Sequence, residues 1–216
     1  MGYMDEMMSS VPEGVSGNWE VKKFSVSKED AEFDMMRSIY SSSGSGRYVP
    51  AGQYTGLYVN GHVMMSDTPD ELSDHYQPLS VASGICSVSG LGLGCVVEGM
   101  LKKRDSQGRL AVDKVIVLEK SKDVLNLVES HFVDRYGDRI EVRNVDALEY
   151  KPPREERYDV VWHDIWLHLC EDNLEEMTLL HRRYGRKCDW QGSWGREILK
   201  RRRQKNRRND RRGFFF

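Results

Sequence analysis

Residues 83–94 read Ser83-Gly-Ile-Cys-Ser-Val-Ser-Gly-Leu-Gly-Leu-Gly94 and continue into Cys95-Val-Val-Glu-Gly-Met100. An apolar run, three alternating glycines and a second apolar run predict a buried strand, a tight turn and the start of a helix. Glycines in such a turn allow a nucleotide-like ligand to approach the backbone closely, next to the helix N-terminus. The fold of the whole chain can be worked out from this stretch.

Strands and helices alternate after residue 80. Strands are predicted at residues 81–88, 114–119, 139–143, 158–164 and 188–192, and helices at residues 94–103, 121–137, 172–184 and 195–208. This alternation predicts an α/β fold, a Rossmann-like doubly wound sheet that is mostly parallel and carries helices on its faces. Few residues follow the fifth strand, and most are Arg, Lys or Asn. The sheet is therefore expected to be truncated at its C-terminal edge.

The first 78 residues are predicted to form a small α+β appendage. Residues 1–17 show no periodicity and are expected to be a mobile arm. A strand at 19–26 and a helix at 31–40 precede a hairpin at 54–65, where Asn60-Gly61 separates two apolar runs. A helix is then expected through residues 66–76. We divide the chain into residues 1–78, a Rossmann-like domain at 79–199 and a basic extension at 200–216.

Charge is distributed unevenly along the chain. Residues 200–216 hold nine Lys or Arg and one Asp, a net charge of +8, so the other residues sum to −10 because the whole chain carries −2. A basic segment of this density favours sequence-independent contact with nucleic-acid phosphates. The alternative uses are a solvated run or a helix that docks on a partner protein.

The cysteines and the apolar runs exclude several protein classes. Cys86, Cys95, Cys170 and Cys188 show no Cys-x-x-Cys pairing, so neither a metal site nor a disulfide framework is predicted. No apolar run approaches the ~20 residues of a membrane span, and the N-terminus lacks the pattern of a signal peptide. A cytoplasmic protein without a membrane partner is expected.

Three positions are predicted to meet at one edge of the sheet. Gly90-Leu-Gly-Leu-Gly94 follows the first strand, Glu119 ends the second, and Asp146 follows the third. The carboxyl ends of neighbouring parallel strands line one crevice. Glu119 suits a ribose diol as a hydrogen-bond acceptor, and Asp146 suits the amino group of adenine. Alternatively, the glycines only form a tight turn and Asp146 only caps a short helical turn at residues 147–149.

From Met65 to Gly192 the chain resembles the class I S-adenosylmethionine-dependent methyltransferases. The resemblance rests, in the family's order, on Gly90-Leu-Gly-Leu-Gly94, Val115-Ile-Val-Leu-Glu119, Asn144-Val-Asp-Ala-Leu148 and Tyr158-Asp-Val-Val-Trp-His-Asp164. It implies S-adenosylmethionine as cofactor and an N or O atom as methyl acceptor. It also implies a catalytic or acceptor-orienting role for Asp164 or His163. The residues expected to bind the cofactor are Ser89, Gly90, Leu91, Gly92, Gly94, Glu119, Lys120, Asp146, Ala147 and, as a lid residue, Met65.

Two alternatives remain open at this point. Cys86 and Val88 stand where most members of the family carry an acid and a further glycine. This departure is compatible with a non-catalytic Rossmann-like interaction module, for example one of viral origin, and with an aminopropyltransferase-like enzyme. The exit of the fourth strand, His163-Asp-Ile-Trp166, lacks the paired acids expected to hold a polyamine, which argues against the second alternative.

Overall fold

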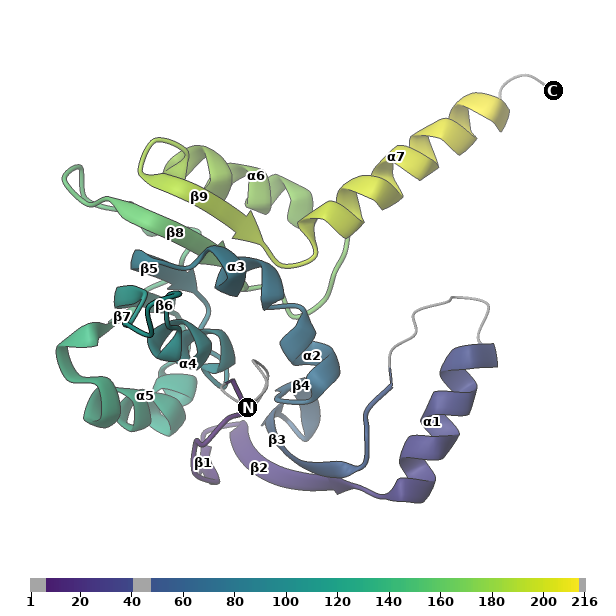
Figure 1. Cartoon of the computed structure of the whole chain (residues 1–216). Coiled ribbons are helices and arrows are strands. Elements are labelled where there is room, and N and C mark those ends of the chain that lie inside the picture. The colour runs from purple at the N-terminus through teal and green to yellow at the C-terminus, as the bar shows by residue number, and fades with distance from the viewer. Residues whose placement is uncertain (1–6, 41–47, 214–216) are drawn as a thin grey trace.

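The computed structural model describes residues 7–40 and 48–213, which form two sheets with helices around them (Figure 1). The larger sheet contains β5 (Gly84–Ser89), β6 (Val112–Glu119), β7 (Ile140–Asn144), β8 (Tyr158–His163) and β9 (Cys188–Ser193). All five strands are parallel, in the order β7-β6-β5-β8-β9. The order reverses at β5, so a crevice is expected at its carboxyl end.

Helices flank the parallel sheet. α4 (Cys95–Lys102) and α5 (Lys122–Tyr136) pack against β6 and β7, and α5 is followed by the 3-10 turn η1 (Gly137–Arg139). α6 (Asn173–Tyr184) and α3 (Tyr76–Val81) pack against β8 and β9. The prediction of a Rossmann-like α/β fold is confirmed. β9 is an edge strand, and within the described residues the chain leaves it as a helix and adds no further strand.

The apolar runs of the sequence form the interior of this sheet. Val115 and Val117 of β6 are fully buried, as are Val88 and Cys86 of β5. Strands covered on both faces need such continuous apolar runs. Burial of each of these valines stabilises the fold by about 1.5–3 kcal/mol.

The second sheet is antiparallel and lies N-terminal to the first. It contains β1 (Gly14–Ser16), β2 (Trp19–Val26), β3 (Gly52–Val59) and β4 (His62–Ser66), in chain order. The predicted hairpin is present, with positive φ at Asn60 (50°) and Gly61 (78°), as a two-residue turn requires. α1 (Lys28–Tyr40) lies between β2 and β3 in the chain.

The expectation of a mobile arm over residues 1–17 is wrong for residues 7–17, and residues 1–6 lie outside the described part. Met7 is 2% exposed and Val11 is 1% exposed, and both belong to the core that includes the parallel strands. Val21 of β2 and Leu57 of β3 belong to the same core, and β1 and β2 pack on α5. The N-terminal sheet therefore packs on α5 and shares one hydrophobic core with the parallel sheet.

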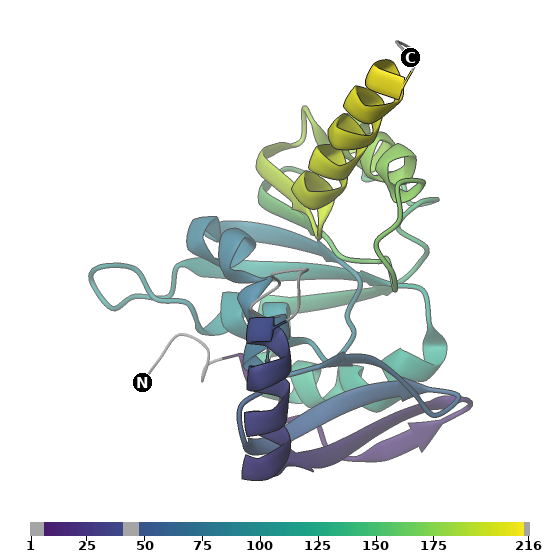
Figure 2. The same ribbon diagram turned by 90° about the vertical axis from the view of Figure 1, so that its right-hand side faces the viewer.

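Two further predictions need correction. The helix expected at 66–76 is shorter, α2 (Pro69–Ser73), because the chain turns at Asp74 and His75, and the separate helix α3 begins only at Tyr76 and runs to Val81. Consequently the first parallel strand begins at Gly84 and not at residue 81. The last helix, α7 (Arg196–Gly213), is longer than predicted and extends away from both sheets (Figures 1 and 2). Within the described residues, no helix is both long enough and apolar enough to cross a membrane.

Candidate functional site

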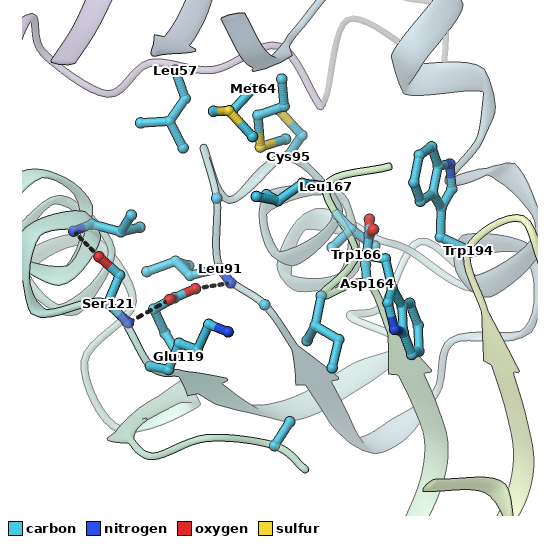
Figure 3. Close-up of a pocket in the computed structure, with 18 of the residues that line it drawn as sticks. Leu57, Met64, Leu91, Cys95, Glu119, Ser121, Asp164, Trp166, Leu167 and Trp194 are labelled. Atoms are coloured by element: carbon cyan, nitrogen blue, oxygen red, sulfur yellow. Dashed lines mark hydrogen bonds between the residues drawn. The ribbon is translucent and has the colours of Figure 1, made fainter. Parts of the chain in front are cut away.

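A pocket of about 500 Å³ opens at the carboxyl ends of β5, β6 and β8, beneath β3 and β4 (Figure 3). Its lining combines the glycine loop, the exits of three parallel strands, the β3–β4 hairpin, and α2 with the residues after it. The N-terminal sheet therefore supplies one wall of the pocket. Ligand sites of enzymes commonly have volumes of about 300–1,000 Å³.

The backbone conformation and the packing of the glycine loop require glycine at all three positions, whether or not a ligand is bound. Gly90, Gly92 and Gly94 have φ values of 93°, 52° and 75°, a region that favours glycine. A Cβ atom at Gly90 would overlap the backbone carbonyl oxygen of Asp164, and one at Gly92 would overlap the Sδ of Met65. Gly90 and Gly92 line the pocket, whereas Gly94 packs against the ring of Phe132 and does not. The sequence pattern suggested close approach by a ligand, but it did not reveal these close approaches by the chain.

Glu119 joins the glycine loop to the start of α5. Its Oε2 accepts a hydrogen bond from the backbone N–H of Leu91 (2.9 Å), and its Oε1 accepts one from Ser121 (2.7 Å) (Figure 3). Ser121 in turn caps α5 by accepting from the N–H of Val124. Glu119 is 8% exposed and lines the pocket. The sequence predicted its position, and the structure adds the two backbone donors that orient its carboxylate.

Asp146 lies beside Glu119 in the lining, at the exit of β7. Its Oδ1 accepts from the N–H of Leu148 (2.8 Å), and its carbonyl accepts from Tyr150. The capping role that the sequence left open is therefore present, in a residue that also lines the pocket. Ala147 and Lys120 line the same end.

Met65 lies over the glycine loop. Its Sδ is 3.2 Å from the backbone N of Leu93, which donates to it. Met64 and Trp19, also from the N-terminal sheet, line the pocket beside it. The sequence-based prediction of Met65 as a lid residue thus corresponds to a residue that covers the loop.

The opposite end of the pocket is acidic, and its main parts were missed in the sequence. Asp70, Glu71 and Asp74 come from α2 and the residue after it, and Asp164 comes from the exit of β8. Both oxygens of Glu71 accept bonds from Ser66, which holds α2 on β4. The only signal in the sequence was a set of acids near a helix start, which has an ordinary explanation in the helix dipole.

These acids change one conclusion from the sequence. The exit of β8 provides a single acid to the pocket, as the sequence indicates, but α2 and the residue after it add three more. The argument that the site lacks paired acids therefore does not hold for the folded pocket. Trp194, which also lines it, donates its indole N–H to Oδ2 of Asp74 at 2.9 Å.

His163 and Asp164, predicted as a pair, point to different surroundings. The side chain of Asp164 is 24% exposed and lines the pocket, and burial, followed by the nearby Asp74 charge, raises its pKa to about 7. His163 is fully buried behind the pocket wall, where its Nδ1 and the hydroxyl of Ser89 are 3.0 Å apart. Burial, His181 and Arg183 lower its pKa to about 3. Neither His163 nor Ser89 lines the pocket, so of the predicted pair Asp164 alone is placed to meet a ligand.

No metal site emerges from the described residues, where no group of three or more His, Cys, Asp or Glu side chains is arranged to hold an ion. Cys86, Cys95, Cys170 and Cys188 are free thiols. Burial raises the pKa of Cys86 to about 12, which keeps it a neutral core residue.

No protein-family model matches the sequence, and a search of curated protein sequences finds no match. Solved structures that are similar include a dimethyladenosine transferase from Plasmodium falciparum, with 20% identity and a TM-score of 0.36 over 45% of this chain and 32% of that one. They also include the CcbJ methyltransferase from Streptomyces caelestis, with 18% identity and a TM-score of 0.40 over 54% and 43%. An rRNA methylase from Streptococcus thermophilus has 14% identity and a TM-score of 0.39 over 53% and 64%.

These solved neighbours are methyltransferases by name, and this chain spans between 32% and 64% of their lengths. At such identities and scores, the likeness describes the α/β arrangement only.

Proposed function

We propose that this chain is an S-adenosylmethionine-dependent methyltransferase and that the pocket described above holds the cofactor. The observation that supports the proposal is the convergence of Gly90, Gly92, Glu119 and Asp146 on one pocket, at the point where the strand order reverses. The glycine loop, Glu119 and Asp146 come from three different places along the chain, as expected for a nucleoside site on this fold.

The residues at the end of the pocket that holds Glu119 and Asp146 fit the adenosine half of the cofactor. Each oxygen of Glu119 accepts one backbone hydrogen bond, and a carboxylate has about four lone-pair positions, so the carboxylate has capacity for a ribose diol. Leu118, Val124 and Ala147 supply apolar wall beside Asp146, which suits a planar base.

The amino-acid half would be held differently from the pattern that the family resemblance implies. Cys86 and Val88 are fully buried in the core, so neither contacts a ligand. The carboxylates of α2 line the pocket instead and provide counter-charge for the cofactor's ammonium group. Bound there, the cofactor supplies an electrophilic sulfonium methyl group.

The chain's own residues then position the acceptor and control its proton. Asp164 offers a carboxylate with a pKa near neutrality, which suits a general base. Met65 and Trp19 cover the pocket from the N-terminal sheet and limit the access of water. Catalysis is assigned mainly to proximity and orientation.

Calorimetric titration with S-adenosylhomocysteine tests this proposal. Wild-type protein should bind, and Glu119→Gln should bind about 10- to 100-fold more weakly, because charge-assisted hydrogen bonds to the ribose contribute about 1.5–3 kcal/mol. Glu175→Gln is the matched control, since it removes one exposed charge on α6, outside the pocket. Circular dichroism melting shows whether each variant is folded. Absence of both heat and thermal stabilisation at millimolar ligand would leave the non-catalytic module as the better interpretation.

Aminopropyl transfer is the second candidate, and one observation favours it. Four carboxylates, those of Asp70, Glu71, Asp74 and Asp164, line the α2 end of the pocket, and paired acids are expected to hold a polyamine acceptor. Aminopropyl transfer would use decarboxylated S-adenosylmethionine as the donor. Tighter binding of decarboxylated S-adenosylmethionine than of S-adenosylmethionine would support this candidate, and the reverse order would support methyl transfer.

For the basic extension, we propose contact with nucleic-acid phosphates through α7. Arg201, Arg202, Lys205 and Arg207 are exposed on a helix that extends away from the body (Figure 2). Retention on nucleic acid at low salt should fall when residues 200–216 are removed, and with the double substitution Arg201→Gln and Arg202→Gln. The matched control replaces two exposed lysines, Lys23 and Lys28, by Gln. Unchanged retention after the truncation would refute the proposal.

A further inference from the structure

His75 places a buried nitrogen in the pocket without a partner from the protein. Its side chain is 6% exposed and lines the α2 end of the pocket. The Nδ1 atom has no hydrogen-bond partner among the described residues. Roughly nine in ten buried polar groups of folded proteins are hydrogen-bonded, so an exception that lines a pocket indicates contact with a ligand.

The fold itself does not use this nitrogen. The backbone N–H of His75 donates to the carbonyl of Leu72 (3.1 Å), and its carbonyl accepts from the N–H of Leu79 (3.2 Å). The side chain makes no capping hydrogen bond to α3, although His75 is the residue that precedes this helix. Burial lowers the pKa of His75 to about 4, so at pH 7 the imidazole is neutral, with one donor and one acceptor nitrogen.

Asp164 lies across from this nitrogen. Its Oδ2 is 3.8 Å from Nδ1 of His75, which is too far for a direct hydrogen bond. A single oxygen or nitrogen atom of a ligand could lie about 2.8 Å from both. His75 precedes α3 and Asp164 follows β8, and these two elements pack against each other. The pair therefore defines a position for one polar atom of a ligand.

A hydroxyl group fits this position better than an ammonium group. A hydroxyl oxygen donates one hydrogen bond and also accepts, whereas an ammonium group only donates. The hydroxyl can donate to Asp164 and accept from a protonated Nδ1 of His75, or donate to an unprotonated Nδ1 and accept from a protonated Asp164. Burial, followed by the Asp74 charge, raises the pKa of Asp164 to about 7, so both of its protonation states occur near neutrality.

The walls around these two polar groups are aromatic. The ring of Trp194 is held by its N–H bond to Asp74 at 2.9 Å, and the ring of Trp166 by its N–H bond to Glu176 at 2.6 Å. Both residues line the pocket, and Figure 3 shows them near Asp164. Indole rings fixed in this way favour contact with another aromatic ring. This end of the pocket therefore suits a planar ring that carries a hydroxyl group.

We propose that the acceptor substrate is a phenol, whose hydroxyl group lies between Nδ1 of His75 and Oδ2 of Asp164 and whose ring packs against Trp194. The inference rests on the proposed methyltransferase function and names its substrate class. The phenol O–H bond breaks and its proton moves to Oδ2 of Asp164, while the electron pair stays on the oxygen. That oxygen forms the new bond to the methyl carbon as the carbon–sulfur bond breaks, and the electron pair of the broken bond stays on sulfur. His75 is neutral throughout and positions the oxygen.

Three probes of nearly equal size separate the possible head groups. They are 4-fluorophenol, 4-fluoroaniline and 4-fluorotoluene, which carry a hydroxyl, an amino and a methyl group at the same position. Binding is measured by fluorine NMR titration at pH 8, with and without S-adenosylhomocysteine. The wild-type protein should bind 4-fluorophenol at least about tenfold more tightly than 4-fluorotoluene, and at least about threefold more tightly than 4-fluoroaniline.

Substitutions at His75 show whether its nitrogen contacts the hydroxyl group. His75→Leu should bind 4-fluorophenol about tenfold more weakly, the size of one lost hydrogen bond, and should bind 4-fluorotoluene no more weakly than the wild type does. His75→Asn, whose amide can take the place of Nδ1, should stay within about threefold of the wild type. Asp164→Asn should also weaken binding of 4-fluorophenol, and Glu175→Gln should leave it unchanged. Melting curves show whether each variant folds.

Equal binding of 4-fluorophenol and 4-fluorotoluene would overturn the inference. Tighter binding of 4-fluoroaniline than of 4-fluorophenol would also overturn it, as would wild-type selectivity in a folded His75→Leu variant. Failure of S-adenosylhomocysteine to bind would contradict the proposed function. Binding of S-adenosylhomocysteine without selective binding of 4-fluorophenol would contradict only the inference about the acceptor.

Discussion

The two ends of the pocket are built from different kinds of structure. At the adenosine end, Glu119 and Asp146 sit at exits of adjacent parallel strands, and backbone N–H groups of nearby residues satisfy their oxygens. At the acidic end, α2 meets the exit of β8, and the Nδ1 of His75 has no hydrogen-bond partner beside Asp164. The first end is a preorganised scaffold, whereas the second gathers carboxylates around an imidazole nitrogen that has no hydrogen-bond partner. Under the proposed function, the first end would bind the adenosine part of the cofactor and the second end would carry Asp164, the proposed general base.

The largest effect is expected from Gly90→Ala, which tests the rigidity of the first end. The new Cβ would overlap a backbone carbonyl at a φ of 93°, and backbone cannot move aside as a flexible side chain can. We expect a loss of about 3 kcal/mol or more in the free energy of unfolding, measured by urea denaturation.

Gly108→Ala is the matched control for this substitution. Gly108 has a similar φ of 77° with no atom close enough to clash, so its substitution should cost only the conformational penalty of about 1–2 kcal/mol. Equal losses of stability in the two variants would show that the Asp164 carbonyl does not crowd the glycine loop. The contrast between the two ends of the pocket would then weaken.

An intermediate effect is expected from Asp164→Asn, which tests the buried carboxyl group at the second end. Because the folded-state pKa of Asp164 is raised to about 7, the native protein holds a proton that the unfolded chain releases above about pH 4. The wild type therefore loses stability from this group as pH rises from about 4 to 7. The Asn variant should be more stable by about 1–3 kcal/mol at pH 8 and nearly equal to the wild type at pH 4.

Urea denaturation of both proteins at both pH values measures this difference. The comparison isolates the contribution of Asp164, because the neighbouring groups Asp74, Glu71 and His75 are present in both proteins. Asp172→Asn, at an exposed position before α6, is the control and should show no pH-dependent difference. A stability difference between the Asp164 variant and the wild type that is the same at pH 4 and pH 8 would contradict the raised pKa.

The smallest effect is expected from Met65→Leu, which tests the cover of the glycine loop. Leucine retains most of the side-chain volume but lacks the sulfur that accepts a hydrogen bond from the Leu93 N–H. The free energy of unfolding should therefore change by less than about 1.5 kcal/mol. Affinity for S-adenosylhomocysteine should change more than in the control Met64→Leu, which lines the pocket without that backbone contact. The reverse order of the two effects on affinity would show that Met65 is not the lid residue.

The adenosine end was accessible from the sequence because its rules are local. Apolar runs in the sequence indicate β5, β6 and β8, and the rule that the carboxyl ends of parallel strands converge predicts that Gly90, Glu119 and Asp146 lie together. The hairpin at Asn60-Gly61 followed from turn chemistry in the same way.

The acidic end was not accessible, because it depends on a long-range return of the chain. Nothing in residues 69–75 indicates that α2 will face Asp164, which lies about ninety positions later in the sequence. Met7 and Val11 are buried without any periodicity that would have shown it. His163 was overvalued because side chains alternate along a strand, so it and Asp164 face different surroundings.

The most direct measurement is the crystal structure of the protein with S-adenosylhomocysteine. The proposed cofactor site predicts ribose hydroxyls within hydrogen-bond distance of the Glu119 carboxylate, the adenine beside Asp146, and the sulfur directed towards Asp164. Binding at another surface, or a ribose that makes no contact with Glu119, would contradict it.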